Sequence, residues 1–149
     1  MATATILQSL NDSANQSGVT ASNRRQVESF IASAAIAAND LVCLDFSKSD
    51  DGDKALFIKK ADSGDGETVA AIGFALNTAA AGETCEVTIA GLHVSANVDA
   101  STDVGFRLKV SNTAGRAGIY TNTDTVPVIA YAVEADTANV ATVFVIKQF

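Results

Sequence analysis

The feature of this sequence that most limits its fold is a succession of short apolar segments, each closed by turn-forming residues. Leu41–Phe46, Ala55–Lys59 and Thr84–Val94 are such segments, and Asp50–Asp53 is one of the turn clusters between them. Short segments rich in Val, Ile and Thr are typical of strands. Thr68–Asn77 is almost entirely apolar, which predicts a strand buried on both faces. Turns at intervals of about 8 to 12 residues indicate a sandwich or a barrel.

The amino-acid composition supports strands over helices. The chain of 149 residues contains 15 Val, 9 Ile and 14 Thr but only 8 Leu, 5 Glu and 6 Lys. Because β-branched side chains suit pleated, half-buried surfaces, a helical bundle or coiled coil is disfavoured. A further 27 residues are Ala, which lets sheets approach closely but buries little area per residue. We therefore expect contacts with other chains to supply part of the stability.

The sequence repeats a pattern of strands at an offset of 57 residues. Two pairs of segments match at this offset, Ile72–Leu76 with Ile129–Val133 and Val87–Ile89 with Phe144–Ile146. The stretch before each half also matches, since Asp40–Leu44 resembles Asp103–Leu108 with one residue of slippage. The repeat predicts an all-β domain over residues 34–149, made of two similar halves at about 35–94 and 95–149. We expect eight or nine strands in a β-sandwich or small β-barrel. The predicted core consists of Ile72, Phe74, Val87, Ile89, Leu108, Ile129, Tyr131, Phe144 and Ile146.

Residues 1–33 are predicted to form an extended N-terminal arm. Met1–Asn23 is polar apart from a small apolar cluster at Ile6, Leu7 and Leu10, so it cannot bury enough apolar surface to offset its ordering entropy. Two interpretations stay open, a plain disordered tail and a tether that orders on a partner. Within the same range, Gln26–Ile31 favours a strand over a short helix, because no capping box precedes it.

The charge and the two ends of the chain exclude several classes of partner. The net charge is −7, so nucleic acid and anionic membrane surfaces would repel the chain. The N-terminus lacks the basic and apolar regions of a signal peptide, and no apolar run reaches the length of a membrane span. These features predict a protein made in the cytoplasm. Cys43 and Cys85 then read as two structural thiols, with a disulfide as the alternative.

The sequence offers no set of residues for common catalytic chemistry. Asp50–Asp53 and Asp62–Glu67 resemble calcium loops only superficially, because neither has the spacing of an EF-hand, and we interpret both as hairpin turns. His93 is the sole histidine, and the sequence contains no nucleophile elbow or phosphate-binding loop to accompany it. We predict a surface or interface position for His93. The chain is predicted not to be an enzyme and to need no metal or cofactor.

One stretch resembles a known family. Ala71–Val87, followed by Gly91, is similar to the Gly-aromatic-Ala-Leu strand and Ala-Ala-Gly-Glu-Thr turn of the capsid decoration (cement) proteins of tailed bacteriophages. Pro127–Val133 is a weaker copy, and the resemblance extends over about 36–146. The chain departs from that pattern at Ala130, where the family commonly has Gly. It also has Asn39 before Asp40 and Thr102 before Asp103, where the family commonly has Gly before the Asp.

The resemblance implies a β-rich protein that binds the outer surface of the expanded phage head and stabilises contacts between major capsid protein subunits. It also implies a homotrimer or a dimer, a virion location after synthesis in the bacterial cytoplasm, and an arm that adds a strand to the coat. The candidate capsid-binding residues of the arm are Ile6, Leu7, Leu10, Arg24 and Arg25. The alternative is a carbohydrate-binding or host-attachment module, which needs exposed aromatic side chains. Only Tyr120 and Tyr131 are available for that role, and Tyr131 is predicted to be buried.

Overall fold

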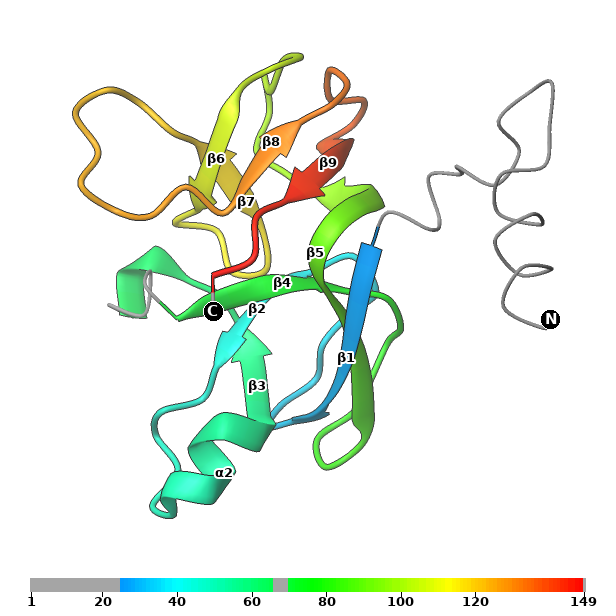
Figure 1. The fold of residues 1–149 in the computed structure, drawn as a ribbon, viewed down its shortest axis with the longest axis vertical. Helices are drawn as coiled ribbons and strands as arrows, with labels where there is room; N and C mark the ends of the chain where they lie inside the picture. Colours follow the sequence, from blue (N-terminus) through cyan, green and yellow to red (C-terminus); the bar gives the residue numbers. More distant parts are fainter. Residues whose placement is uncertain (1–24, 66–69, 149) are drawn as a thin grey trace, which may run out of the picture.

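The computed structural model describes residues 25–65 and 70–148, which form nine β-strands and little helix (Figure 1). The all-β prediction is confirmed. The elements are β1 (Arg25–Ala32), β2 (Leu41–Leu44), α2 (Asp51–Leu56), β3 (Phe57–Lys60), the 3-10 turn η2 (Ser63–Asp65), β4 (Ala71–Ala75), β5 (Thr84–Asn97), β6 (Arg107–Val110), β7 (Ala117–Ile119), β8 (Ala130–Ala132) and β9 (Val140–Val145).

The first half of the chain closes into a five-stranded barrel, barrel 1, with the strand order β1-β3-β2-β4-β5. Closure comes from β1, which pairs with β3 on one edge and with β5 on the other. The β1–β3 pair is parallel and the others are antiparallel. The predicted strand at 26–31 is therefore confirmed. The predicted arm boundary at residue 33 is wrong, because β1 is an integral stave of the barrel.

Alternation along the strands fills barrel 1. In β5 the side chains of Cys85, Val87 and Ile89 point inward, and in β2 the side chain of Val42 does the same. The remaining buried members of this interior are Phe30, Ala32, Ile36, Ile58, Ile72, Ala75 and Ala79. As predicted, every residue of β4 is buried. Its outward-facing Phe74 packs in a second cluster, which lies between the two halves of the molecule.

The second half forms a smaller barrel, barrel 2, which shares the long strand β5 with barrel 1. The C-terminal part of β5 pairs with β9, followed by β8, β6 and β7. A parallel bridge between Val98 and Ala117 brings β7 back beside the end of β5. Barrel 2 contributes five Ala residues to the cluster between the two halves, namely Ala96, Ala117, Ala130, Ala132 and Ala141. Small side chains let so short a set of strands curl tightly, which gives the high Ala content of the sequence a structural role.

The two barrels repeat one another at the level of individual pairings. The parallel pair Ala32–Ile58 in barrel 1 corresponds to Val98–Ala117 in barrel 2. In this correspondence β5 has two roles. Its N-terminal part is the last strand of barrel 1, and its C-terminal part is the first strand of barrel 2. Strands β2, β3, β4 and the first part of β5 match β6, β7, β8 and β9.

Backbone hydrogen bonds outside the strands repeat as well. The Ala79 N–H donates to the Ile36 carbonyl at 3.0 Å, and the Asp136 N–H donates to the Thr102 carbonyl at 2.9 Å. Asn39 and Gly105, which precede β2 and β6 at matching positions, both have positive φ. Only the tertiary pairing reveals this correspondence fully, because each strand pair has its own sequence offset.

Two residues of the predicted core lie on the surface. Tyr131 is 44% exposed and Phe144 is 47% exposed. The pairing Phe74–Thr88 in barrel 1 corresponds to Tyr131–Phe144 in barrel 2, so β9 follows β5 at an offset of 56 residues, one less than the sequence alignment assumed. That single residue reverses the faces of β9 and places Val143 and Val145 inside. Ile146 is half-buried, and the other predicted core residues are buried, namely Ile72, Phe74, Val87, Ile89, Leu108 and Ile129.

The barrels share one continuous apolar cluster. Leu41, Cys43 and Phe74 on the outer face of barrel 1 belong to the same cluster as the interior of barrel 2. The connection between β6 and β7 reaches across, since Leu41 N–H donates to the Gly115 carbonyl at 2.8 Å. The outer face of barrel 1 therefore forms the floor of barrel 2.

The connection between β2 and β3 differs from the prediction. Residues 50–53 were predicted to be a plain turn and 55–59 a strand, but α2 occupies 51–56. Asp50 caps this helix, because its carboxylate accepts hydrogen bonds from the backbone N–H groups of Gly52 and Asp53. No residue of α2 is buried, so the helix projects from the barrel rather than packing in it.

Candidate functional site

The predicted capsid-binding residues fall almost entirely outside the described part of the chain. Ile6, Leu7, Leu10 and Arg24 lie there, and only Arg25 is described. Arg25 is exposed, begins β1, and pairs with Gly91 of β5. Gly91 also pairs with β9, so the chain enters the fold where the two barrels meet.

His93 does not lie on the surface as predicted, because its side chain is only 1% exposed. Its Nδ1 lies 3.1 Å from Thr88 Oγ1, its Nε2 lies 3.2 Å from Asn39 Oδ1, and its ring stacks on Phe74. Burial and the positive charge of Arg25 lower the pKa of His93 to about 4. His93 is therefore a neutral member of the contact between the barrels.

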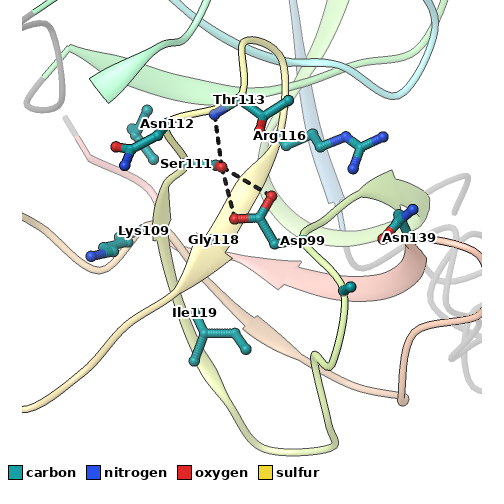
Figure 2. A pocket seen from close by; sticks show the side chains of 11 residues that line it. Asp99, Lys109, Ser111, Asn112, Thr113, Arg116, Gly118, Ile119 and Asn139 are labelled. Atoms are coloured by element: carbon teal, nitrogen blue, oxygen red, sulfur yellow. Dashed lines mark hydrogen bonds between the residues drawn. The ribbon is translucent and has the colours of Figure 1, made fainter. Parts of the chain in front are cut away.

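A polar groove of about 510 Å³ opens on barrel 2, beside β6 and β7. Figure 2 shows the Asp99 carboxylate meeting the Ser111 hydroxyl in this groove. The hydroxyl donates to Asp99 at 2.7 Å and accepts from the Thr113 N–H at 3.0 Å. A Cβ on Gly118 would lie 2.9 Å from Asp99 Oδ2, so glycine there leaves space for the carboxylate. These bonds fix the start of the β6–β7 turn and use the hydroxyl in a structural role.

The Asp99–Ser111 pair has a counterpart on barrel 1. Asp45 occupies the position equivalent to Ser111, and Ser33 the position equivalent to Asp99, so acid and hydroxyl are exchanged. Burial opposes ionisation of Asp45, but the neighbouring hydroxyls of Ser33 and Ser47 and the Ser47 N–H outweigh it and lower its pKa. The Ser33 hydroxyl lies near Asp45 outside regular hydrogen-bond geometry. The shared Asp–Ser pair is thus a structural element of the repeat.

An aromatic surface lies on the outside of barrel 2, and we call Arg107, Tyr120, Tyr131 and Phe144 the aromatic face. Tyr131 pairs with Phe144 on one side and with Arg107 on the other, so the three form a row across β9, β8 and β6. The Arg107 guanidinium lies 4.7 Å from the centre of the Tyr120 ring. Such a row of exposed aromatic rings beside a cation is suited to binding rather than to isolated solvation.

The loop beside the aromatic face is held firmly. Lys109 Nζ lies 2.6 Å from Asp124 Oδ1, and the Tyr120 hydroxyl donates to the Asp124 carbonyl at 2.8 Å. The Lys109 ammonium, together with the Thr121 N–H and hydroxyl, lowers the pKa of Asp124 to about 2. These bonds position Tyr120 next to the row.

A second exposed patch lies at the far end of barrel 1, and we call the β2–β3 connection, residues 45–56, the acidic tip. Phe46 is 50% exposed and Leu56 is 52% exposed. The tip contains four Asp and two Lys, which gives it a net charge of −2. Figure 1 shows α2 and strand β8 at opposite ends of the long axis of the molecule.

The described residues contain no group of three or more His, Cys, Asp or Glu side chains that could hold a metal ion. No disulfide joins Cys43 and Cys85, which are buried in different clusters. Over the same described part of the chain, no helix is long and apolar enough to cross a membrane.

No protein-family model matches the chain, and no curated protein sequence matches it either. Among solved structures, the chain is similar to the head fiber gp8.5 N base of bacteriophage phi29, with a TM-score of 0.50 and 17% sequence identity. The similarity covers 82% of this chain and 94% of that chain. Coverage of this extent includes both barrels, so the likeness is one of the whole fold.

Sequence reasoning missed the groove and the aromatic face. The groove is assembled from residues after β5, from β6, β7 and the turn between them, and from Asn139, and only the folding of barrel 2 brings these segments together. The aromatic face was missed for two reasons. The assumed offset of 57 directed Phe144 into the core, whereas strand pairing relates β9 to β5 at 56. Tyr131 does match Phe74 at 57, but Phe74 faces outward and is covered by barrel 2, whereas Tyr131 has no such cover in the described chain.

Proposed function

We propose that this protein is a structural component of a bacteriophage virion, and specifically a decoration protein bound to the outer surface of the head. The observation that carries the proposal is the similarity of the double-barrel fold to a domain named as the base of a phage head fiber. A decoration protein would stabilise contacts between neighbouring major capsid protein subunits. Its site of action would be the virion, after synthesis in the bacterial cytoplasm.

The sequence supports the assignment as a decoration protein. The stretch that resembles decoration proteins, Ala71–Val87, forms β4, the following turn and the start of β5. These strands connect the interior of barrel 1 to the contact with barrel 2, so the resembling residues form the structural centre of the molecule.

The mechanism relies on binding without chemistry. The N-terminal arm would lose conformational entropy when it docks on the coat and gain backbone hydrogen bonds to it. The double barrel gives the arm a rigid anchor at Arg25, between the two barrels. A homotrimer or dimer would hold several arms at once, so modest individual contacts would combine into firm attachment.

Co-sedimentation with expanded capsids that lack this protein tests the proposal. The full chain is expected to pellet with capsids, and deletion of Met1–Asn23 is expected to weaken binding at least about tenfold because it removes the arm. A variant with Ile6, Leu7 and Leu10 changed to Ser should behave like the deletion. A matched control with Gln8, Ser9 and Asn11 changed to Ala should bind like the wild type.

Capsid binding of the deletion variant at full strength would refute the role of the arm. Failure of the full chain to bind any expanded capsid would refute the decoration function. Circular dichroism and thermal unfolding of each variant distinguish lost binding from lost folding.

A second candidate function is host attachment through a carbohydrate. It is favoured by the exposure of Tyr131 beside Phe144, since aromatic side chains on a surface can stack on sugar rings. A glycan array tests it, with Tyr131→Ala as the matched variant. Glycan binding that Tyr131→Ala abolishes would support attachment, whereas an array without signal would remove this candidate.

A further inference from the structure

The contact between the barrels gives a template for a second contact. Within one chain, barrel 2 covers a row of side chains on barrel 1 formed by Leu41, Phe74 and Thr88, which pair across β2, β4 and β5. All three residues have no exposed surface. The β6–β7 connection of barrel 2 reaches this side of barrel 1, since Gly115 N–H donates to the Ala61 carbonyl at 2.9 Å.

Barrel 2 carries the equivalent row, and that row is open. Strand pairing makes Arg107, Tyr131 and Phe144 the counterparts of Leu41, Phe74 and Thr88. Tyr131 and Phe144 keep 44% and 47% of their surface exposed. No barrel follows in the described chain to cover this row.

Barrel 1 carries the equivalent of the inserting connection. Strands β2 and β3 correspond to β6 and β7, so the acidic tip corresponds to the β6–β7 connection. The tip is longer, contains α2, and exposes Phe46 and Leu56 by 50% and 52%. In a second copy, the tip is the element that would occupy the place of the β6–β7 connection. It therefore presents large apolar side chains to the uncovered row of Arg107, Tyr131 and Phe144.

We propose that the acidic tip of one copy docks on the aromatic face of a second copy, head to tail. The tip has a net charge of −2, and Arg107 places a cation at one end of the row on the aromatic face, so the two surfaces can form charge pairs across the contact. Apolar side chains meet aromatic ones at the centre, surrounded by charge, as in protein interfaces generally. The contact between two copies would then have the same arrangement as the contact between barrel 1 and barrel 2 within one chain.

The geometry determines the type of assembly. The two patches differ, so the contact is heterologous, and it closes into a ring if the rotation per copy allows and extends as a chain otherwise. Helix α2 of the tip and strand β8 of the aromatic face lie at opposite ends of the molecule (Figure 1). The proposal refines the self-association in the proposed function but does not depend on capsid binding.

Two single variants and their mixture test the proposal by analytical ultracentrifugation. Phe144→Asp removes the aromatic face and keeps the tip, whereas Leu56→Asp removes the tip and keeps the face. We expect the wild type to associate at micromolar concentration and each variant alone to dissociate at least about tenfold more readily. A mixture of the two variants should form a one-to-one dimer that grows no further, because only one complementary pair of patches remains.

Val27→Asp is the matched control, since Val27 is 38% exposed on β1, outside both patches, and this variant should associate like the wild type. A monomeric wild type, or a mixture that stays monomeric, would overturn the proposal. So would wild-type association of either patch variant. Capsid co-sedimentation of the same variants separates this outcome from the proposed function, because monomers that still bind capsids would refute only the docking.

Discussion

At the scale of single residues, His93 illustrates how the double barrel uses a polar side chain. The ring stacks on Phe74 of β4 and lies within hydrogen-bond distance of Thr88 of β5 and of Asn39, which precedes β2. His93 thus contacts three separate segments of the chain. A buried polar ring with both nitrogens satisfied fixes the geometry of a contact without leaving an unpaired group. The low pKa of about 4 follows from its burial and from Arg25 nearby.

His93 should make folding sensitive to mild acid. Its pKa is about 4 when folded and about 6.5 when unfolded, so between these values the unfolded chain binds more protons. Its contribution is complete well above pH 6.5 and is lost as the pH falls towards 4, by about 2.5 kcal/mol at pH 4.5. In urea unfolding, the free energy of unfolding should fall between pH 7.5 and 4.5 in both proteins. The fall should be smaller in His93→Gln than in the wild type, by about the contribution of His93. Equal losses in both proteins would contradict the assignment.

At the scale of elements, the crossing of β4 and β5 depends on Gly73. A Cβ at this position would lie 2.0 Å from the Thr88 carbonyl oxygen and 2.8 Å from its carbon. The register of β2 and β4 shifts beside the same residue, between Val42 and Cys43. In barrel 2, Ala130 takes this position as an inward-facing residue, so the second copy needs no such close approach.

Gly73→Ala is expected to destabilise the protein by about 3 kcal/mol, because the backbone of β4 must move away from β5. Gly82→Ala is the matched control, since Gly82 has a φ of +85° but no atom within 4 Å of an added Cβ. The control should cost only about 1 kcal/mol, the usual strain of a left-handed alanine. Urea unfolding of both variants measures the difference, and similar losses would argue against the close approach as its cause.

At the scale of the whole molecule, the shared strand and the shared cluster bind the two barrels into one folding unit. Leu41, Cys43 and Phe74 would be left uncovered if barrel 2 unfolded alone. If barrel 1 unfolded, barrel 2 would in turn lose the apolar face on which it packs and its first strand, β5. Barrel 1 has an interior of its own, but its outer apolar face is covered only by barrel 2, and barrel 2 has no core apart from the shared cluster.

Unfolding should therefore be a single transition at both ends of the molecule. The chain has no Trp, so Val27→Trp and Val104→Trp would report separately on barrel 1 and barrel 2. We expect the same urea midpoint for both reporters. Adding Phe74→Ala, which removes the ring at the contact, should lower the free energy of unfolding by about 3 kcal/mol. Both urea midpoints should then fall together. Midpoints that separate would show that the barrels unfold independently.

The sequence by itself determined the all-β class, the number of strands and the division into two similar halves. Strand alternation and turn residues are local, so they can be read along the chain. Burial of most predicted core residues, such as Ile72 and Leu108, followed from the same alternation.

The tertiary structure alone decided which strands close each barrel, which outer face is covered and where His93 lies. Closure depends on β1 and β3 meeting across the chain, and alternation cannot indicate which of two apolar faces another barrel will cover. Tyr131 is exposed because barrel 2 covers the equivalent row on barrel 1 but nothing in the described chain covers its own. The exposure of Phe144 depended on one residue of register in β9. A strand has a period of two, so that one residue exchanges its inner and outer faces, and only long-range pairing fixes it.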